Sequence, residues 1–348
     1  MKNRKREICT SGSVRDEDGQ PPHLLGHRRQ FLHLAAGAAA LPTLSRVART
    51  QAYPSRPVRI IVGFTAGSAT DITARLFAQK LNEAWKTPVT VENIPGAGGS
   101  VGAERVAKSA PDGSTLYWGA NGAMTINPSL QPSPAFDPAR DLAPIARVLV
   151  MPSILAVNNE VPAKSVAELF VLAKAQPGKL SFASPGVGTP QHIAGELLKS
   201  LAGVDIVHVP YRGAVLTDVI SGRVTMTLMN MGAILPLVRD GKLRGLAVTS
   251  LKRSPIISEL PTLAESGFPD FEAISWFGLL APAGTPAAVV SKVHADIVQI
   301  AVQADVRERI AQLGLEASLT SPEEFAVVIK LDTAKWGKVI RAANIKAE

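Results

Sequence analysis

Short runs of β-branched residues alternate with helical segments along the chain, and each run ends in a turn that contains glycine. The runs at 58–64, 89–93 and 115–119 are predicted strands, and apolar residues recur at helical spacing after the first of them. Ser100 has the position of a cap for a second helix that continues through Lys108. Because parallel strands need a crossover connection, this order predicts an open parallel sheet covered by helices.

The same alternation restarts after a proline-rich, irregular stretch at 127–141. Ser165 and Glu168 have the spacing of a full capping box, and Thr189 followed by Pro190 predicts the start of another helix. The strands that we expect in this second unit are 153–157, 180–183, 205–209, 224–229 and 245–249.

The C-terminal part contains one more predicted strand, 276–280, and then two amphipathic helices without strands of their own. The first of these helices opens at Thr285, and Ser321 with Glu324 forms a capping box for the second. Helices without their own strands indicate that the chain returns to its first domain. The apolar stripe expected on the first helix is Val289, Val293, Ile297 and Val302.

The order of elements therefore predicts an α/β protein of two domains. We expect domain 1 to comprise residues 53–150 and 250–348, and domain 2 to comprise residues 151–249, with two connecting strands as the hinge. A chain of 348 residues is long enough for two cores of ordinary size.

The positive charge is concentrated near the N-terminus. Residues 1–52 hold nine Lys or Arg and four acids, which is +5 of the formal net charge of +8, so nucleic-acid binding is not favoured. Arg28 and Arg29 stand before Phe-Leu and the mildly apolar stretch 34–41, the pattern of a removable export signal. The pair resembles a twin-arginine signal, and the basic region of a Sec signal is the alternative. We expect cleavage after Ala52 and a periplasmic protein.

Three predicted strand-to-helix turns, at 64–71, 95–100 and 184–189, are candidates for ligand contact. In open α/β sheets ligands bind outside the carboxyl ends of the strands, where free amides and the helix dipole favour a carboxylate or phosphate. Any one of these glycine turns could serve only to reverse the chain. Three of them in equivalent positions favour a site for a small anion.

Nucleotide binding is only weakly indicated. Residues 96–102 are close to a dinucleotide fingerprint, but the third glycine falls one residue late. The following strand ends at Asn121 without an acid that could hold a ribose, and the chain has no Gly-Lys-Ser/Thr motif of a P-loop.

Few residues offer catalytic or metal chemistry. Cys9, the one cysteine, lies in the predicted signal, and His192, His208 and His294 lack metal-ligand spacing. His192 could face a cleft, although a histidine at a helix start is more often at the surface, and His208 is expected to be half-buried in a strand. Asp71 could bind a ligand amine, or it could cap the helix or interact with the helix dipole at its N-terminus. We expect no cofactor and no metal.

Six segments carry recognisable motifs in a fixed order, and they are 53–71, 95–102, 111–116, 184–192, 208–213 and 281–286. Taken together, these motifs resemble those of Bug proteins, the periplasmic substrate-binding receptors of tripartite tricarboxylate transporters (TctC-like). The similarity runs from about Tyr53 to the C-terminus.

The resemblance implies a two-lobed periplasmic-binding-protein (Venus flytrap) fold, type II-like, that closes on a small carboxylate without cofactor or catalysis. It also implies delivery to the large and small membrane subunits of the transporter, by a receptor that we expect to be monomeric. Two departures stand out: the first turn reads Thr-Ala-Gly-Ser at 65–68 where a Pro-Gly-Gly type is usual, and Asn230 stands where many relatives carry an acid. The departure at Asn230 bears on the ligand's charge.

Carrying the family pattern onto this chain makes the turns at 64–71 and 184–189 the carboxylate-holding segments. The ligand-binding residues that we expect are Phe64, Ala66, Gly67, Ser68, Asp71, Gly96, Ala97, Gly98, Ser184, Gly186, Gly188, Thr189, His192 and Asn230. Two other functions stay open at this point: an exported enzyme that uses Asp71 or His192 as acid or base, and a sensor of the same kind of ligand.

Overall fold

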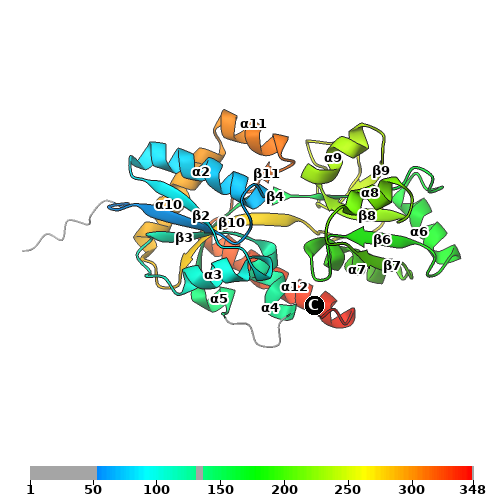
Figure 1. The fold of residues 1–348 in the computed structure, drawn as a ribbon, viewed down its shortest axis with the longest axis horizontal. Helices are drawn as coiled ribbons and strands as arrows, with labels where there is room; N and C mark the ends of the chain where they lie inside the picture. Colours follow the sequence, from blue (N-terminus) through cyan, green and yellow to red (C-terminus); the bar gives the residue numbers. More distant parts are fainter. Residues whose placement is uncertain (1–52, 131–135, 347–348) are drawn as a thin grey trace, which may run out of the picture. The chain divides into compact units, whose positions relative to one another are not determined.

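The computed structural model describes residues 53–130 and 136–346, so the expectations about the export signal lie outside the described residues. Two separate β-sheets organise these residues, each with helices packed on its faces (Figure 1). This arrangement confirms the predicted two-lobed α/β fold.

The first sheet has the strand order β11-β4-β10-β3-β1-β2. Its parallel part is β1 (Val58–Val62) between β2 (Val89–Asn93) and β3 (Thr115–Ala120). These three strands pair in parallel, as the sequence predicted, and the remaining pairings of the sheet are antiparallel. The antiparallel strands are β4 (Leu142–Met151), β10 (Ser275–Pro282) and β11 (Glu316–Ala317).

The second sheet has the strand order β7-β6-β8-β5-β9 and is also mixed. Strand β6 pairs in parallel with β7 and β8, whereas β5 runs antiparallel to β8 and β9. The strands are β5 (Ser153–Val157), β6 (Ser181–Ser184), β7 (Val207–Pro210), β8 (Met226–Asn230) and β9 (Arg244–Val248).

Helices connect and cover the strands. Those of the first sheet include α2 (Ala69–Trp85), α3 (Ser100–Ala107), α10 (Ala287–Ala301) and α11 (Ala304–Gln312). Those of the second sheet are α6 (Val166–Ala175), α7 (Pro190–Ala202), α8 (Val215–Ile220) and α9 (Met231–Arg239). Short helical turns lie at η1 (Ala97–Gly99), η2 (Gly122–Ile126), α4 (Asn127–Leu130) and α5 (Pro138–Asp141). Helical turns therefore occupy 127–130 and 138–141, within a stretch that was expected to be irregular.

Some predicted helix features differ in detail. Helix α3 is preceded by Gly99 without a side-chain cap, and the Ser100 hydroxyl instead accepts a hydrogen bond from Asn127 Nδ2 at 2.9 Å. Ser165 does cap α6, but the Glu168 carboxylate accepts from the Lys164 amide, so the capping box is incomplete.

The predictions for the C-terminal helices also held only in part. Val302 is 54% exposed and does not belong to the apolar stripe of α10. The capping box at Ser321 is present and opens α12 (Pro322–Ala342).

The chain crosses between the two sheets twice, once from β4 to β5 at Pro152 and once from β9 to β10 through residues 249–274 (Figure 1). Helix α12 makes a further link, because it packs on β4 and on α7. Its buried residues Trp336 and Ile340 belong to the apolar core of the second sheet.

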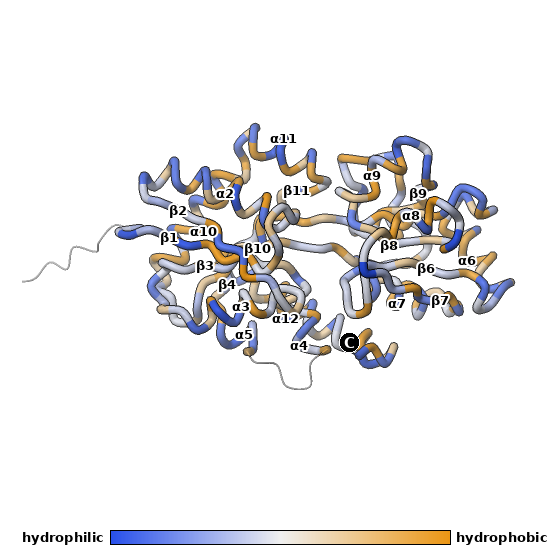
Figure 2. Tube along the Cα trace, in the orientation of Figure 1, coloured by the Kyte–Doolittle hydropathy of each residue, from blue (hydrophilic) through white to orange (hydrophobic). Residues whose placement is uncertain are grey.

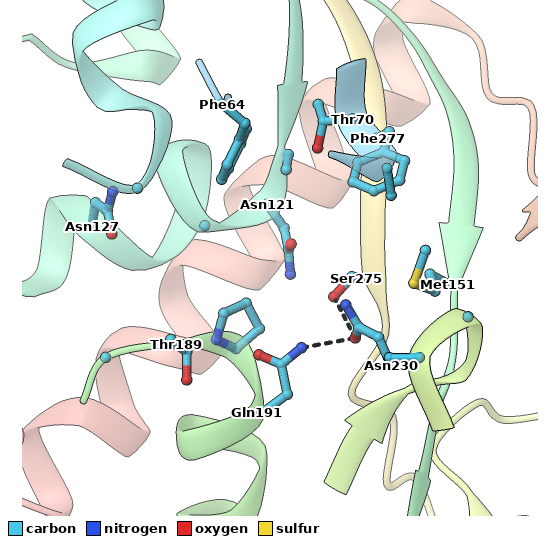
Figure 3. Close-up of a pocket in the computed structure, with 18 of the residues that line it drawn as sticks. Phe64, Thr70, Asn121, Asn127, Met151, Thr189, Gln191, Asn230, Ser275 and Phe277 are labelled. Atoms are coloured by element: carbon cyan, nitrogen blue, oxygen red, sulfur yellow. Dashed lines mark hydrogen bonds between the residues drawn. The ribbon is translucent and has the colours of Figure 1, made fainter. Parts of the chain in front are cut away.

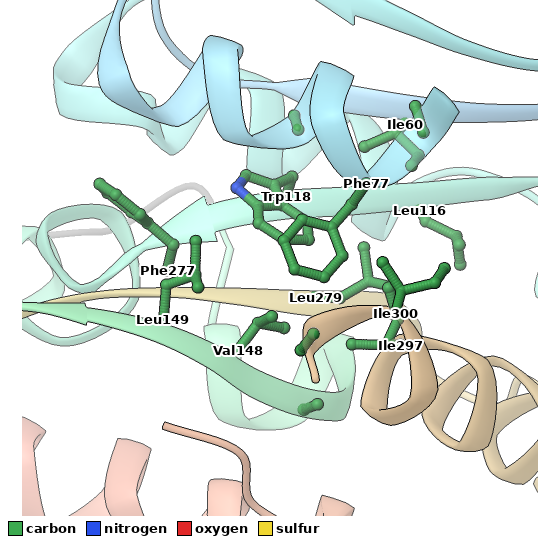
Figure 4. Packing of buried hydrophobic residues seen from close by; sticks show 14 of the residues in the cluster. Ile60, Phe77, Leu116, Trp118, Val148, Leu149, Phe277, Leu279, Ile297 and Ile300 are labelled. Carbon is green, nitrogen blue, oxygen red and sulfur yellow. The ribbon is translucent and has the colours of Figure 1, made fainter. Parts of the chain in front are cut away.

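The core of the first sheet lies between its strands and helices α2 and α10 (Figure 4). Phe77 and Trp118 are fully buried with ring centroids 5.0 Å apart, and the Trp118 indole N–H donates to Thr73 Oγ1. Figure 2 shows hydrophobic residues along the strands and hydrophilic residues on the outer helices. Burial of a ring such as that of Phe77 stabilises the fold by about 1.5–3 kcal/mol.

Candidate functional site

A cavity of about 870 Å³ lies between the two sheets, and residues from both contribute to its wall (Figure 3). None of the described residues that line it carries an ionisable side chain. Its apolar wall includes Phe64, Phe277, Met151 and Leu313, and its polar side chains come mainly from amides and hydroxyls. The polar lining residues are Thr70, Asn121, Asn127, Thr189, Gln191, Asn230, Ser275 and Gln312.

Two long helices begin at this cavity. Ala69 and Thr70 start α2, and Thr189 to Gln191 start α7. Ser68 caps α2 through the amide of Asp71, and Thr189 caps α7 through the amide of His192, as the sequence predicted for Thr189. The amides of the first helical turn have no acceptor within their own helix, so both helix starts present partial positive charge to the cavity.

Asp71 lies beside the cavity but does not line it. Asp71 is 3% exposed, and its carboxylate accepts hydrogen bonds from the Gly67 amide at 2.9 Å, from Arg75 Nε and from Asn93 Nδ2. Burial alone would raise the pKa of Asp71, but these bonds lower it below its ordinary value. Asp71 therefore ties the turn to the start of α2, and its oxygens are already occupied.

The turn after β2 places Ala97 and Gly98 in the cavity wall, whereas Gly96 lies outside it. Asn127 holds this turn, since its Nδ2 donates to the carbonyl of Ala97 at 2.6 Å. The side chain of Asn127 itself also lines the cavity (Figure 3).

The turn after β6 contributes Gly188 and Thr189 to the wall. Ser184 and Gly186 lie behind them, and His192 does not line the cavity. The His192 ring is buried, at 6% exposure, and accepts a hydrogen bond from the Gly188 amide at 3.1 Å. The expectation that His192 is a surface residue was therefore wrong, whereas His208 is half-buried in β7, as predicted.

The two histidines lie parallel, with ring centroids 3.7 Å apart. Burial and the positive charge of Lys199 lower the pKa of His192 to about 4. Burial, the neighbouring His192 and Lys199 lower the pKa of His208 to about 3. Both rings are therefore neutral near pH 7.

Asn230 forms a hydrogen-bonded cluster at the cavity wall. Its Oδ1 accepts from Gln191 Nε2 at 2.8 Å and from Ser275 Oγ at 3.4 Å (Figure 3). The same oxygen accepts from Ser153 Oγ at 3.2 Å. Ser153 and Ser275 are the first residues of β5 and β10, which follow the two crossings between the sheets. The cluster thus joins the cavity to both crossings.

The structure divides the predicted ligand residues into two groups. Those that line the cavity are Phe64, Ala97, Gly98, Gly188, Thr189 and Asn230. Those that lie outside its lining are Ala66, Gly67, Ser68, Asp71, Gly96, Ser184, Gly186 and His192.

Other polar lining residues were not predicted. Asn121 and Ser275 stand at the ends of β3 and β10 that reach the cavity, and Gln191 follows the Thr189 cap. The position of Asn121 directly after a buried strand was the signal available for it, since ligands gather at such strand ends. Ser275 had no comparable signal, because its strand runs in the opposite direction.

Among the residues that the structure describes, no helix combines the length and hydropathy that crossing a bilayer requires. Across residues 53–130 and 136–346, no three His, Cys, Asp or Glu side chains gather as metal ligands would.

Two α/β lobes with a cavity between them are the architecture of periplasmic binding proteins. The chain belongs to the tripartite tricarboxylate transporter family receptors, because residues 73–345 match that family. This family consists of solute-binding receptors of the TctC and Bug type and not of enzymes.

Relatives agree with this assignment. Protein BugT of Bordetella pertussis is 34% identical over 297 residues, which cover 84% of this chain and 91% of BugT. The structure of Rpa4515 of R. palustris with adipate is 35% identical, with a TM-score of 0.73 over 84% of this chain and 99% of that one. The structure of MatC from Rhodopseudomonas palustris with bound malate is 31% identical, with a TM-score of 0.69 over 83% of this chain and 100% of that one.

Proposed function

We propose that this protein is an exported receptor that captures a small carboxylate in the cavity between its lobes and delivers it to the membrane subunits of a tripartite tricarboxylate transporter. The observation that carries this proposal is a cavity at which α2 and α7 both begin and whose described lining residues have no ionisable side chain. Amides at helix starts bind carboxylates well, and adipate and malate are the compounds in the two relatives' structures.

The lobes in this proposal are residues 53–150 with 250–348, and residues 151–249. The two sheets divide the strands in the same way, and the crossings at Pro152 and at 249–274 would act as the hinge. A cavity with walls from two lobes excludes water only when the lobes close, and fewer competing waters strengthen the bonds between amides and anion.

The proposal also includes export. The segment with Arg28 and Arg29 would direct the precursor to the periplasm and be removed after Ala52, and the mature receptor would act as a monomer. An enzyme that works through Asp71 or His192 is not supported, since the family is one of receptors and neither side chain lines the cavity.

The decisive experiment is mass spectrometry of the compound that co-purifies with the protein, followed by calorimetry with that compound, adipate and malate. The proposal expects a small carboxylate that is recovered chemically unchanged. Scattering with and without ligand tests closure, because a bound receptor should have a smaller radius of gyration. Binding of none of these acids, with the protein shown to be folded, contradicts the proposed function.

A further inference from the structure

The turn from Ser184 to Thr189 rests on two stacked histidines that the receptor mechanism does not otherwise use. We propose that His192 and His208 are positioning residues, which hold this turn in the shape that presents Gly188 and Thr189 to the ligand. This inference rests on the proposed function, because the turn forms part of the carboxylate site proposed above.

The contact between His192 and the turn is direct. The Gly188 amide donates a hydrogen bond to Nδ1 of His192 at 3.1 Å. The next residue, Thr189, caps α7, and its carbonyl accepts a hydrogen bond from the Ile193 amide. A neutral imidazole accepts at one nitrogen and donates at the other. The proton of His192 therefore lies on Nε2, which faces the carboxylate of Glu196 at 3.9 Å.

The contact between His208 and the turn runs through Ser184. His208 Nε2 lies 2.7 Å from Ser184 Oγ, and this oxygen also contacts the amide and the carbonyl of Gly186, at 3.2 Å and 3.1 Å. One arrangement of protons satisfies all three contacts: His208 and the Gly186 amide donate to the hydroxyl, and the hydroxyl donates to the Gly186 carbonyl. Each glycine of the turn is thus connected to one histidine.

The stack keeps both rings in place. The two imidazoles are 11° from parallel, and His208 continues the stack onto Phe182, with centroids 4.7 Å apart. The pairing of β6 with β7 sets this geometry, since Phe182 and His208 are partners in the register of the two strands. His208 therefore stacks on both Phe182 and His192, and His192 is held by its stack on His208. Rings fixed in this way can hold their nitrogens in place, which is what a positioning residue requires.

Gly188 has a backbone conformation that residues other than glycine rarely adopt. Gly188 has φ of +76°, and a Cβ there would lie 2.8 Å from Leu130 Cδ1. Since glycine is free to adopt many conformations, the turn needs outside contacts to select this one. The His192 acceptor supplies such a contact at the residue that lines the cavity.

Three variants separate positioning from simple packing. His192→Phe keeps a flat ring in the stack but removes the acceptor for Gly188, whereas His192→Asn keeps an acceptor at a similar distance along the side chain. His294→Phe is the matched control, because His294 bonds the carbonyl of Thr320 on the first lobe and lies in neither turn nor stack.

The first readout needs no ligand. Hydrogen exchange of the Gly188 amide, measured by NMR on the full mature protein, should become about tenfold faster in His192→Phe and change little in His192→Asn and His294→Phe. Amides in the middle of α7, such as Leu198, should keep their exchange rates and so report that the fold is intact.

The second readout is calorimetry with malate and with adipate. His192→Phe should weaken the binding of either acid that the wild type binds by about tenfold, and His192→Asn should restore most of it. Equal exchange of Gly188 in the wild type and in His192→Phe, or identical behaviour of the Phe and Asn variants, overturns the inference. If the wild type binds neither acid, the proposed function is in question, and the exchange measurement still decides whether His192 positions the turn.

Discussion

A Cβ atom on Gly232 would lie 2.4 Å from the carbonyl oxygen of Leu313, so the backbone of α9 touches the segment after α11. Gly314 makes the reciprocal approach, since a Cβ there would lie 2.5 Å from the Gly232 nitrogen. Gly232 and Leu313 both line the cavity and come from opposite lobes. Only a residue without a side chain permits this contact, which joins the two lobes at one side of the cavity.

Gly232→Ala should therefore hold the lobes apart. A Cβ at 2.4 Å from a carbonyl oxygen cannot be accommodated without a backbone shift, so closure on the ligand becomes unfavourable. We expect at least about tenfold weaker binding of malate or adipate by calorimetry, which corresponds to about 1.4 kcal/mol. Gly213→Ala is the control, because nothing lies within 4 Å of a Cβ at that position. Equal loss of affinity in both variants would contradict the role of this contact.

The turn after β6 gives a second prediction. Gly188→Val introduces a β-branched side chain at a residue with φ of +76°, where it also meets Leu130. Gly186→Val introduces the same side chain at a residue with φ of +141°. Each substitution should weaken ligand binding by at least about tenfold through strain in the turn. Calorimetry on both variants, with circular dichroism to confirm the fold, tests this. Unchanged affinity in both would remove the turn from the site.

The histidine pair predicts how stability depends on pH. The folded protein holds both rings neutral, with pKa values of about 4 for His192 and about 3 for His208, against an ordinary value of 6.5. Below pH 6.5 the unfolded chain therefore binds more protons, and the free energy of unfolding decreases as pH falls from about 6.5 to about 4. The positive charge of Lys199 disfavours protonation of both rings. The carboxylate of Glu196 faces Nε2 of His192.

Thermal melts of the wild type and of a His192→Phe/His208→Phe variant, recorded from pH 8 to pH 4, measure this contribution. The melting temperature of the wild type should decrease more steeply below pH 6.5 than that of the double variant. Carboxylates that do not contact either ring keep their surroundings in both proteins, so the difference between the two curves reports on the histidines and on Glu196 beside His192. Parallel curves would show that the pair does not titrate in this way.

Export provides a prediction outside the described residues. Replacing Arg28 and Arg29 together by lysine should leave precursor in the cytoplasm if the signal is of the twin-arginine type. Fractionation and immunoblotting of the full-length chain measure this. Normal export of the Lys-Lys variant would indicate the Sec route instead.

Local pattern was enough to predict most elements of the fold. Some features depend only on residues within a few positions of one another, and these are strand β1, the cap at Thr189 and the capping box at Ser321. The spacing of apolar residues and the chemistry of capping side chains therefore reveal them. Strand β4 was missed, because Pro144 and Arg147 interrupt its apolar run, and its pairing with β10 comes from a segment more than a hundred residues away.

From the sequence, the site could be predicted only as a set of glycine-containing turns between strands and helices. The sequence by itself determined that helices follow the glycine turns at 64–71 and 184–189, the second of them from Pro190, and it marked both turns as candidate anion sites. It did not determine that Asn230 meets Ser153 and Ser275, or that His192 stacks on His208, because those contacts depend on how strands distant in the chain pair and where the two crossings lie. Side-chain direction at a strand end is decided by register and packing, and only the tertiary structure sets these.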